Sequence, residues 1–295
     1  MQNFKKIGEN VAIIKKYAPL SKTGICDFSA GVKYIWREDF ASEYVEIDGT
    51  LVLKETTREY QNAFYYPVGK NEKLALDFID EYAREKGMDL TFCCLNKEQA
   101  DYLQTRYENA EVFFDRNWSD YVYDAQAFAS FKGKKYAGQR NHVNKFKSLY
   151  KNFAYKRIEE SDLPLIESFI SEYESGRDIN FWIEKEEQNK LLDYVKNLSE
   201  LGQIGACIYV DNKIVGITCG EVINDMLIVH VEKALREYNG IYPTLAQTFS
   251  KDVLENFNIK EINREEDCGD LGLRTSKTQY HPIEIRHKYF LKTKN

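Results

Sequence analysis

The chain has 295 residues, of which 43% are hydrophobic and 30% charged, and its formal net charge is −6. This length suits two domains of ordinary size, and the composition is typical of a folded protein and argues against a disordered one. No apolar run approaches the roughly 20 residues that span a bilayer, and Val11–Ile14 is too short for a signal peptide, so we expect a cytoplasmic protein.

The cysteines and histidines predict neither disulfides nor a metal site. The six cysteines are Cys26, Cys93, Cys94, Cys207, Cys219 and Cys268, and none belongs to a CxxC pair. We expect reduced thiols, mostly buried in strands. No pair of histidines or cysteines has the spacing of metal ligands, so no metal is expected.

The first half of the chain predicts a hairpin, a strand, a helix and a strand. These elements are the hairpin Val45–Leu53, the strand Ala63–Val68, the helix Asn71–Lys86 and the strand Leu90–Leu95. Asp48 and Gly49 tolerate the positive φ of a tight hairpin turn, and Gly87 is typical of a helix C-terminus.

A basic stretch follows, from Ala125 to Arg157, without one Asp or Glu. Its nine cations are Lys132, Lys134, Lys135, Arg140, Lys145, Lys147, Lys151, Lys156 and Arg157. Tyr136, Val143, Phe146 and Tyr150 recur at helical spacing and predict an amphipathic helix with a buried side. Arg140, Lys145, Lys147 and Lys151 are therefore candidate ligands of a phosphate-bearing partner; the alternative is a solvated helix face that happens to be basic.

The second half repeats the same order of elements. Its predicted elements are the strand Ala154–Ile158, a helix capped by Ser161 and Asp162, the helix Glu184–Leu201, the hairpin Ile208–Gly216, the strand Met226–Val231, the helix Tyr242–Asn256 and the strand Ile259–Asn263. Hairpin, strand, helix and strand thus occur twice, which favours a tandem duplication over chance. We place the boundary near residue 152, giving units 1–152 and 153–295, the second being the catalytic candidate.

This layout, with several C-terminal residues, resembles the catalytic domain of lysyl-phosphatidylglycerol synthases. The matching positions are Arg236, Gly240, Gly272, Leu273, Lys277, Tyr280, Pro282 and Tyr289. The resemblance implies two tandem GNAT-like units, each a mixed and mostly antiparallel sheet flanked by helices. It also implies transfer of an aminoacyl group from aminoacyl-tRNA, as in the related peptidoglycan-bridge transferases. The best-known members carry a large membrane domain that this sequence lacks, which argues against a lipid acceptor.

The segment where the GNAT fold binds pyrophosphate departs from its usual pattern. Arg236, Asn239 and Gly240 are candidate cofactor-binding residues, but the glycine is displaced by one position. Tyr242 replaces a small residue, and Pro243 removes a backbone amide from the phosphate cradle. Acyl-CoA is therefore a weaker candidate donor than aminoacyl-tRNA.

The densest acidic cluster of the second unit suggests a catalytic site. Glu266 or Asp267 can orient an acceptor amine, and Lys277 can stabilise a developing oxyanion. Glu232 is expected to flank the gap between two splayed strands, and Arg274 is a candidate phosphate ligand. The alternative is structural: Asp270 would cap the next helix, and the cations would pair with the carboxylates.

His230 also has two interpretations, as a core residue or as a catalytic base. It lies in an apolar run, where a histidine is more often a core residue than a base.

Two functions remain open from the sequence. The first is an acyl- or aminoacyltransferase acting on a small-molecule, peptide or lipid-head-group acceptor. The second is a non-catalytic module that binds an anionic ligand such as RNA or a nucleotide cofactor. The degenerate phosphate turn favours the module, whereas the charged residues from Arg264 to Lys277 favour the enzyme.

Overall fold

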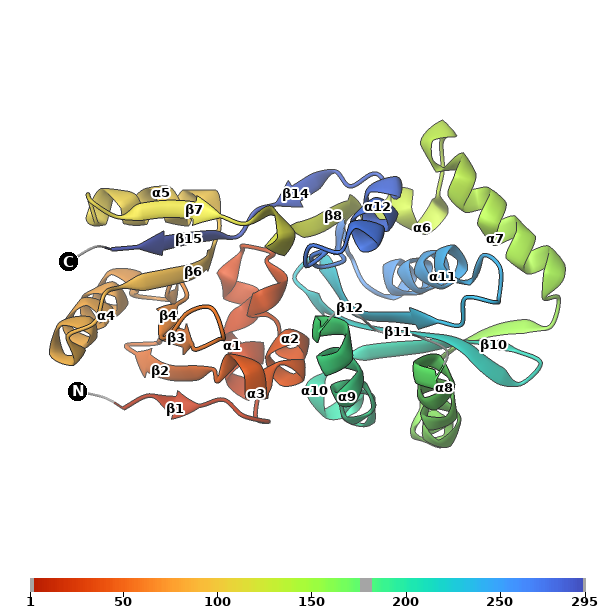
Figure 1. Ribbon diagram of the computed structural model, residues 1–295, viewed down its shortest axis with the longest axis horizontal. Coiled ribbons are helices and arrows are strands. Elements are labelled where there is room, and N and C mark those ends of the chain that lie inside the picture. Colours follow the sequence, from red (N-terminus) through yellow and green to blue (C-terminus); the bar gives the residue numbers. More distant parts are fainter. Residues whose placement is uncertain (1–2, 176–181, 294–295) are drawn as a thin grey trace. The chain divides into compact units, whose positions relative to one another are not determined.

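The computed structural model describes residues 3–175 and 182–293 and divides into two compact units (Figure 1). Unit 1 comprises residues 1–120 and 285–295, and unit 2 comprises residues 121–284. Among the described residues, no helix combines the length and the hydropathy that a membrane span requires.

Unit 1 contains a mixed sheet with helices on it. Its strands are β1 (Lys5–Lys6), β2 (Glu43–Ile47), β3 (Thr50–Glu55), β4 (Ala63–Phe64), β5 (Val68–Gly69), β6 (Thr91–Leu95), β7 (Glu111–Phe114) and β15 (Tyr289–Lys292). Its helices are α1 (Ala12–Ser21), α2 (Ala30–Ile35), α3 (Arg37–Phe40), α4 (Glu72–Lys86) and α5 (Lys97–Arg106). The strands follow the order β1-β2-β3-β4-β6-β15-β7, with β5 paired to β3.

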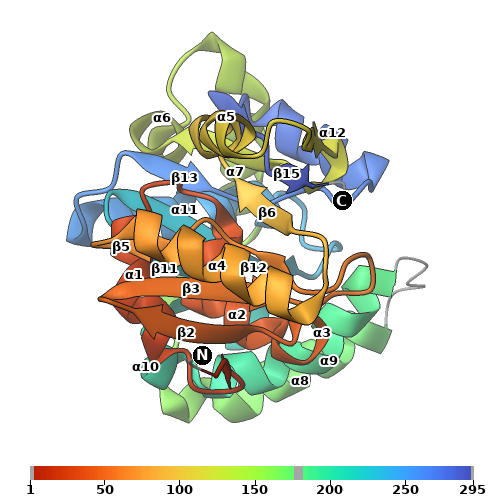
Figure 2. The same ribbon diagram turned by 90° about the vertical axis from the view of Figure 1, so that its left-hand side faces the viewer.

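The core of unit 1 lies between this sheet and one side of α4 and α5. Leu76 and Ile79 of α4 and Leu103 of α5 are fully buried against Phe64 and Phe92 of the sheet. Figure 2 shows α4 lying across the strands. Apolar residues at helical spacing thus meet apolar residues that alternate along strands, and their burial is the main stabilising term.

Unit 2 contains the second sheet. Its strands are β8 (Asp120–Asp124), β9 (Phe153–Arg157), β10 (Ile204–Val210), β11 (Lys213–Ile223), β12 (Met226–Ala234), β13 (Glu261–Asn263) and β14 (Glu284–Arg286). Its helices are α6 (Ala125–Ser130), α7 (Ala137–Leu149), α8 (Leu163–Ser175), α9 (Trp182–Lys196), α10 (Leu198–Leu201), α11 (Ile241–Asn256) and α12 (Leu271–Gln279). The strand order is β14-β8-β13-β12-β11-β10-β9.

The helices of unit 2 cover both faces of its sheet. Within this unit, α6, α7, α11 and α12 lie on one face, and α8 and α9 lie on the other (Figures 1 and 2). Phe146 of α7 and Leu245 of α11 are buried together with Ile208 and Val215 of the sheet. The buried side of the basic helix therefore faces α11 and the sheet, as its helical spacing predicts.

Each sheet contains one strand from the opposite end of the chain. In unit 1, β15 from the end of the chain lies between β6 and β7 and is antiparallel to both. In unit 2, β8 from the first half occupies the matching place between β13 and β14. The two strand orders correspond position by position, which supports the predicted duplication; the duplication itself stays a prediction.

The division by tertiary contacts differs from the predicted boundary near residue 152. Residues 121–152 group with unit 2 because β8 pairs with β13, and because α6 and α7 pack on α11. Residues 285–295 group with unit 1 through β15. Pairing between strands far apart in the chain decided this division, and no local pattern reveals it.

Most predicted elements are confirmed, including both hairpins. Asp48 and Gly49 have φ of 46° and 70°, and Asp211 and Asn212 have φ of 49° and 65°, as tight hairpin turns require. Gly87 ends α4 at a φ of 61°. The fold class is likewise confirmed, since both sheets are mixed and mostly antiparallel.

Two helix predictions need correction. Glu159, not Ser161, caps the chain before α8: it forms a capping box with Asp162. The helix predicted over Glu184–Leu201 is two helices, α9 and α10, separated at Asn197.

Candidate active site

Strands β12 and β13 of unit 2 separate partway along their length. Their parallel pairing runs from Met226–Glu261 to Ile228–Asn263 and then stops. Strand β12 continues to Ala234, whereas β13 ends at Asn263. The pairing therefore ends where the sequence predicts that the two strands splay apart, and we call the stretch beyond Ile228 and Asn263 the strand gap.

A β-bulge at the start of the strand gap displaces His230. On β11, Cys219 pairs with Val231 and the next residue, Gly220, pairs with Val229, so His230 is the extra residue of β12. A Cβ on Gly220 would lie 2.2 Å from the Ile228 carbonyl oxygen, so this close approach requires glycine. Bulges of this kind re-aim a side chain and are common beside active sites.

His230 lies between two carboxylates. Its Nδ1 is 2.7 Å from Glu265 and its Nε2 is 3.0 Å from Glu221, and the imidazole is fully buried. Burial alone would lower the pKa of His230, but the hydrogen bonds to Glu221 and Glu265 raise it to about 9. At neutral pH the ring is therefore an imidazolium that donates to both carboxylates.

Glu265 is held in a left-handed backbone conformation, with a φ of 56°. Its N–H donates to Asn263 Oδ1 at 2.8 Å, and its carbonyl accepts from the Tyr121 N–H at 3.1 Å. A non-glycine residue persists in this region only where its surroundings fix it, and such residues cluster at functional sites. The Glu265 side chain is 23% exposed, so one end of the Glu221–His230–Glu265 triad reaches solvent.

Arg264 and Glu232 bridge the strand gap. Arg264 Nη2 donates to Glu232 Oε1 at 2.7 Å, and the guanidinium lies over the rings of Tyr123, Phe128 and Tyr280. The Arg264 side chain is 10% exposed, and its Nη1 has no hydrogen-bond partner among the described residues. This ion pair joins Glu232 of β12 to the residue that follows β13.

Lys277 holds the backbone that follows β13. Its buried Nζ donates to the carbonyl oxygens of Arg264 and Glu266, each at 2.5 Å. Burial, and then the positive charge of Arg264, lower the pKa of Lys277. The position of Glu266 is thus fixed through its backbone, while its side chain is half-buried.

Asp267 and Arg274 form an ion pair. The fully buried Asp267 accepts from Arg274 Nη2 at 2.7 Å, from the Tyr121 hydroxyl at 2.5 Å and from the Gly269 N–H at 2.9 Å. Burial alone would raise the pKa of Asp267, but these hydrogen bonds, Arg274 first, lower it to about 2. Asp270 caps α12 by accepting from the Leu273 N–H, as predicted.

The turn before α11, where the GNAT fold binds pyrophosphate, is covered by α7. A Cβ on Gly240 would lie 2.2 Å from the His142 carbonyl oxygen. The Tyr242 hydroxyl, from the first turn of α11, donates to the Ala234 carbonyl at 3.2 Å. Arg236 and Asn239 are exposed near this turn.

Three lysines of the basic stretch are available to a ligand, whereas Lys156 and Arg157 at its end pair with acidic side chains. Lys145, Lys147 and Lys151 are exposed, and within the described ranges none of them forms an ion pair. Arg140 differs, because its Nη1 donates to the carbonyl oxygens of Phe131 and Gly133 and fixes the loop that carries Lys132 and Lys134.

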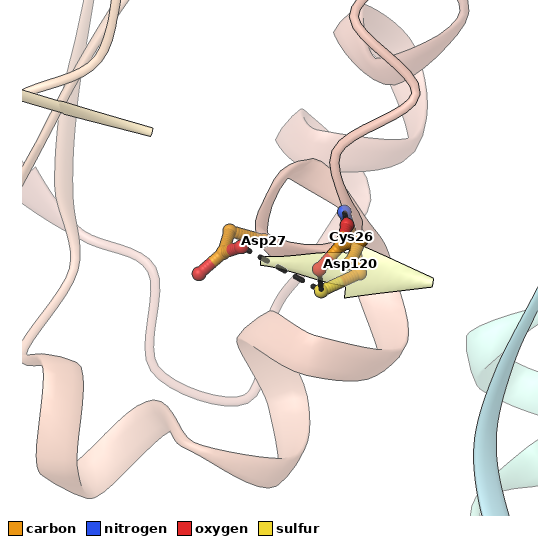
Figure 3. Close-up of side chains that lie close together, drawn as sticks. All are labelled: Cys26, Asp27 and Asp120. Carbon is orange, nitrogen blue, oxygen red and sulfur yellow. Dashed lines mark hydrogen bonds between the residues drawn. The ribbon is translucent and has the colours of Figure 1, made fainter. Parts of the chain in front are cut away.

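Unit 1 carries a separate polar cluster of Cys26, Asp27 and Asp120 (Figure 3). Thiol and carboxylate groups at this spacing can bind a metal ion. The Lys288 ammonium, however, lies 2.5 Å from Asp27, 2.8 Å from Asp120 and 3.2 Å from Cys26. Burial alone would raise the pKa of Asp27, but the charges of Lys288 and Lys33 hold it below its usual value. The ammonium group of Lys288 therefore occupies the position that a metal ion would take.

Glu265 belongs to the acidic cluster recognised in the sequence, but Glu266 and Asp267 were favoured over it, and His230 was interpreted mainly as a core residue. Gly220 was the available signal, because a glycine within a strand often marks a bulge or a close backbone approach. The positive φ of Glu265 has no local sequence signature, since it depends on contacts with Asn263 and Tyr121.

The comparisons with known proteins agree with this architecture. A family model described as "Phosphatidylglycerol lysyltransferase, C-terminal" matches residues 19–292. A conserved protein of unknown function from Bacteroides thetaiotaomicron is 29% identical, with full coverage of both chains and a TM-score of 0.89. The L-PGS from Bacillus licheniformis is 16% identical over 99% of this chain and 95% of that one, with a TM-score of 0.69.

Two more distant similarities complete the comparison. FemX is 10% identical over 98% of this chain and 97% of that one, and its TM-score of 0.58 shows a shared fold. An uncharacterised protein of Mycoplasmoides gallisepticum is 22% identical over 199 residues. That match covers 66% of this chain and 62% of the relative, so it spans less than two thirds of that protein.

Proposed function

Because the chain belongs to the family of phosphatidylglycerol lysyltransferase C-terminal domains, we propose that it is an aminoacyltransferase whose donor is an aminoacyl-tRNA. The basic helix α7 carries this proposal. Its exposed lysines offer positive charge to the tRNA backbone, and its buried side is fixed on α11.

The covered turn at Gly240 supports a tRNA donor over acyl-CoA. Pyrophosphate binding at a helix start needs backbone N–H groups that point at open space. The α7 backbone lies against Gly240, and Pro243 in the first turn has no N–H to offer. Phosphates would then be bound by Lys145 and Lys147 of α7 and by Lys151 just after it.

The strand gap would hold the reacting ester. Glu232 and Arg264 line it, and transfer of an acyl group requires chiefly a positioned ester and stabilisation of the charge that develops on its carbonyl oxygen. Lys277 is tied to two backbone carbonyls, so Arg264 is the better placed cation for that charge.

Transfer from a mixture of radiolabelled aminoacyl-tRNAs tests the proposal. The protein is expected to release the amino acid faster than buffer does, and Lys145/Lys147/Lys151→Ala is expected to lose most of this activity. The slope of log affinity for tRNA against log salt should become shallower by about two to three, since each lost phosphate contact removes about 0.7 to 0.9.

A charge-matched control separates this helix from a general charge effect. Lys70, Lys73 and Lys86 are exposed in unit 1, and their replacement by alanine removes the same charge. That variant is expected to behave as the parent does. Equal losses in both triple variants would contradict a role for α7.

The second candidate function is a module that binds an anionic ligand without turnover. The pairing of Asp267 with Arg274, and of Lys277 with backbone carbonyls, is the observation that favours it, because structural networks also bury charges in this way. Salt-sensitive tRNA binding by α7 without any release of amino acid would support the module.

A further inference from the structure

Three neighbouring strands of unit 2 contribute polar side chains to one face of the sheet. Thr218 of β11 pairs directly with Glu232 of β12, and Glu232 forms the ion pair with Arg264, which follows β13. Side chains directly opposite each other on antiparallel strands point to the same face, with their Cβ atoms about 5 Å apart. Thr218, Glu232 and Arg264 are therefore neighbours, and we call them the polar row.

The polar row lies on the face of the sheet that α11 covers (Figure 1). A Cβ on Gly216, two residues before Thr218, would lie 3.4 Å from two side chains of α11. Ala234, two residues after Glu232, is buried in the same apolar cluster as those side chains. Residues two apart on a strand share a face, so Thr218 and Glu232 both point to the α11 side.

Two members of the polar row have buried groups without hydrogen-bond partners. Thr218 is fully buried, and its Oγ1 has no partner among the described residues. The Arg264 side chain is 10% exposed, and its buried Nη1 likewise has no partner within residues 3–175 and 182–293. Such groups are costly and uncommon in folded proteins. Two of them beside one carboxylate indicate a site that a ligand completes.

Glu232 gives this site its negative charge and its access to solvent. Its Oε1 accepts from Arg264 Nη2 at 2.7 Å, and its side chain is 13% exposed. A carboxylate has two oxygens and about four lone-pair positions, so Glu232 can accept from a ligand while it stays paired with Arg264. The strongest hydrogen bonds to a carboxylate come from charged donors such as an ammonium group.

The polar row thus combines acceptors with a donor over a short distance. Glu232 and the Thr218 hydroxyl oxygen can accept hydrogen bonds, whereas Arg264 Nη1 can only donate. A matching ligand carries a donor and an acceptor a few ångströms apart. In an α-aminoacyl ester, three bonds separate the ammonium nitrogen from the carbonyl oxygen, which places them about 3 Å apart. A simple acyl ester has the carbonyl oxygen but no such donor.

Building on the proposed function, we propose that Glu232 and Thr218 bind the α-ammonium group of the aminoacyl donor, while Arg264 Nη1 donates to the carbonyl oxygen of the same ester. Glu232 and Thr218 then determine specificity for the donor. The donor class is an ester with a free α-amine, and the site rejects N-acylated aminoacyl groups and simple acyl groups.

Binding of small donor analogues tests this site without tRNA. The probes are amides of the protein amino acids, which keep the ammonium and carbonyl groups, and their N-acetyl derivatives, which lose the ammonium. At about 50 mM, ten times a dissociation constant of about 5 mM, a ligand should raise Tm by roughly 3 °C. At least one amide is expected to do so with saturation, and its N-acetyl derivative is not.

Variants of the two charged residues complete the binding test. Glu232→Gln keeps an acceptor for Arg264 but loses the charge, and Arg264→Lys keeps the ion pair but loses donors. Each should weaken binding of the amide at least about tenfold. Glu255→Gln, at an exposed carboxylate of α11, is the control and should bind as the parent does. No binding by any amide, equal binding of the N-acetyl derivative, or parent-like affinity in either variant would overturn the proposal.

Thr218→Val gives a test in which stability and binding change in opposite directions. A methyl group replaces the unpartnered hydroxyl, so Tm of the protein without ligand is expected to rise by about 2 to 4 °C. Affinity for the amide should fall, because the ammonium loses an acceptor. A lower Tm would show that the hydroxyl already has a partner, such as a fixed water molecule, and would overturn its role as a ligand group.

Transfer assays then separate this inference from the proposed function. The parent should release amino acid from aminoacyl-tRNA but not from the same aminoacyl-tRNA after chemical N-acetylation. Equal release from both would support the proposed function and overturn the ammonium site. If neither donor is consumed while an amide binds, the proposed function fails and the polar row remains a binding site for α-amino compounds.

Discussion

At the scale of single residues, buried hydrogen bonds hold the groups around the strand gap. His230 lies between two carboxylates, and Lys277 donates to two backbone carbonyls. Burial makes each of these contacts strong and makes the loss of one partner costly. Residues proposed for catalysis therefore lie next to residues that stabilise the fold. Each variant must be tested for both turnover and stability.

The pKa of His230 gives the protein a pH-dependent stability. Because this pKa is raised from 6.5 to about 9, its contribution is complete below about pH 6.5 and is lost as the pH rises through 9. Urea unfolding of the parent should show a free energy that falls by on the order of 3 kcal/mol more between pH 7 and pH 10 than in His230→Gln. Equal losses in both proteins would show that the imidazole is not held as an imidazolium.

Lys277→Met is expected to lower the free energy of unfolding by roughly 2 to 4 kcal/mol. The substitution keeps a side chain of similar length but leaves the buried carbonyls of Arg264 and Glu266 without a donor. Lys73→Met, at an exposed position of α4, serves as the control and should unfold as the parent does. A loss of turnover without a loss of stability would instead favour the oxyanion role predicted from the sequence.

At the scale of elements, the position of α7 depends on one glycine. Gly240 has a φ of 87° and lies against the His142 carbonyl, so helix α7 can approach the start of α11 closely. The lysines of α7 belong to the basic stretch recognised in the sequence. Their orientation follows from the burial of Val143 and Phe146 beneath them.

Gly240→Ala is expected to weaken tRNA binding although it removes no charge. The new Cβ meets backbone and the φ is strained, so we expect a loss of about 1 to 3 kcal/mol in stability and a displaced α7. Gly138→Ala is the matched control, because open space surrounds that position and alanine favours the helix. Unchanged tRNA affinity in Gly240→Ala would show that the placement of α7 on α11 does not matter for binding.

At the scale of the whole molecule, the exchanged strands tie each unit to a distant part of the chain. Strand β15 completes the unit 1 sheet, and Lys288 just before it forms ion pairs with Asp27 and Asp120 in the same unit. A unit cut at residue 152 would therefore lack a strand.

Removal of residues 287–295 is expected to destabilise unit 1 selectively, because β14 of unit 2 ends at Arg286. Strands β6 and β7 would lose their shared neighbour, and the buried Asp120 would lose the Lys288 ammonium. Hydrogen exchange should show faster exchange in β6 and β7, with β10 and β11 still protected, and a synthetic peptide of residues 287–295 should restore protection. Removal of residues 294–295 alone is the control. Unchanged exchange after the longer deletion would contradict the role given to β15.

The sequence by itself determined the local elements and the surface chemistry. Helical and strand periodicity located α4, α7, α11 and both hairpins, because these patterns record which residues must be buried together. Family motifs in the last 60 residues pointed to the fold. The lysines of α7 were recognised as a basic surface from their spacing and from the absence of acidic residues among them.

The tertiary structure alone decided the boundary of the units and the composition of the strand gap. The exchange of β8 and β15 depends on pairing across more than a hundred residues, which no local pattern encodes. Likewise, Glu221, His230 and Glu265 meet only because a bulge displaces His230 and the contacts of Asn263 and Tyr121 hold Glu265 at a positive φ. Side chains acquire these roles through neighbours that are distant in the chain, so their spacing in the sequence could not reveal them.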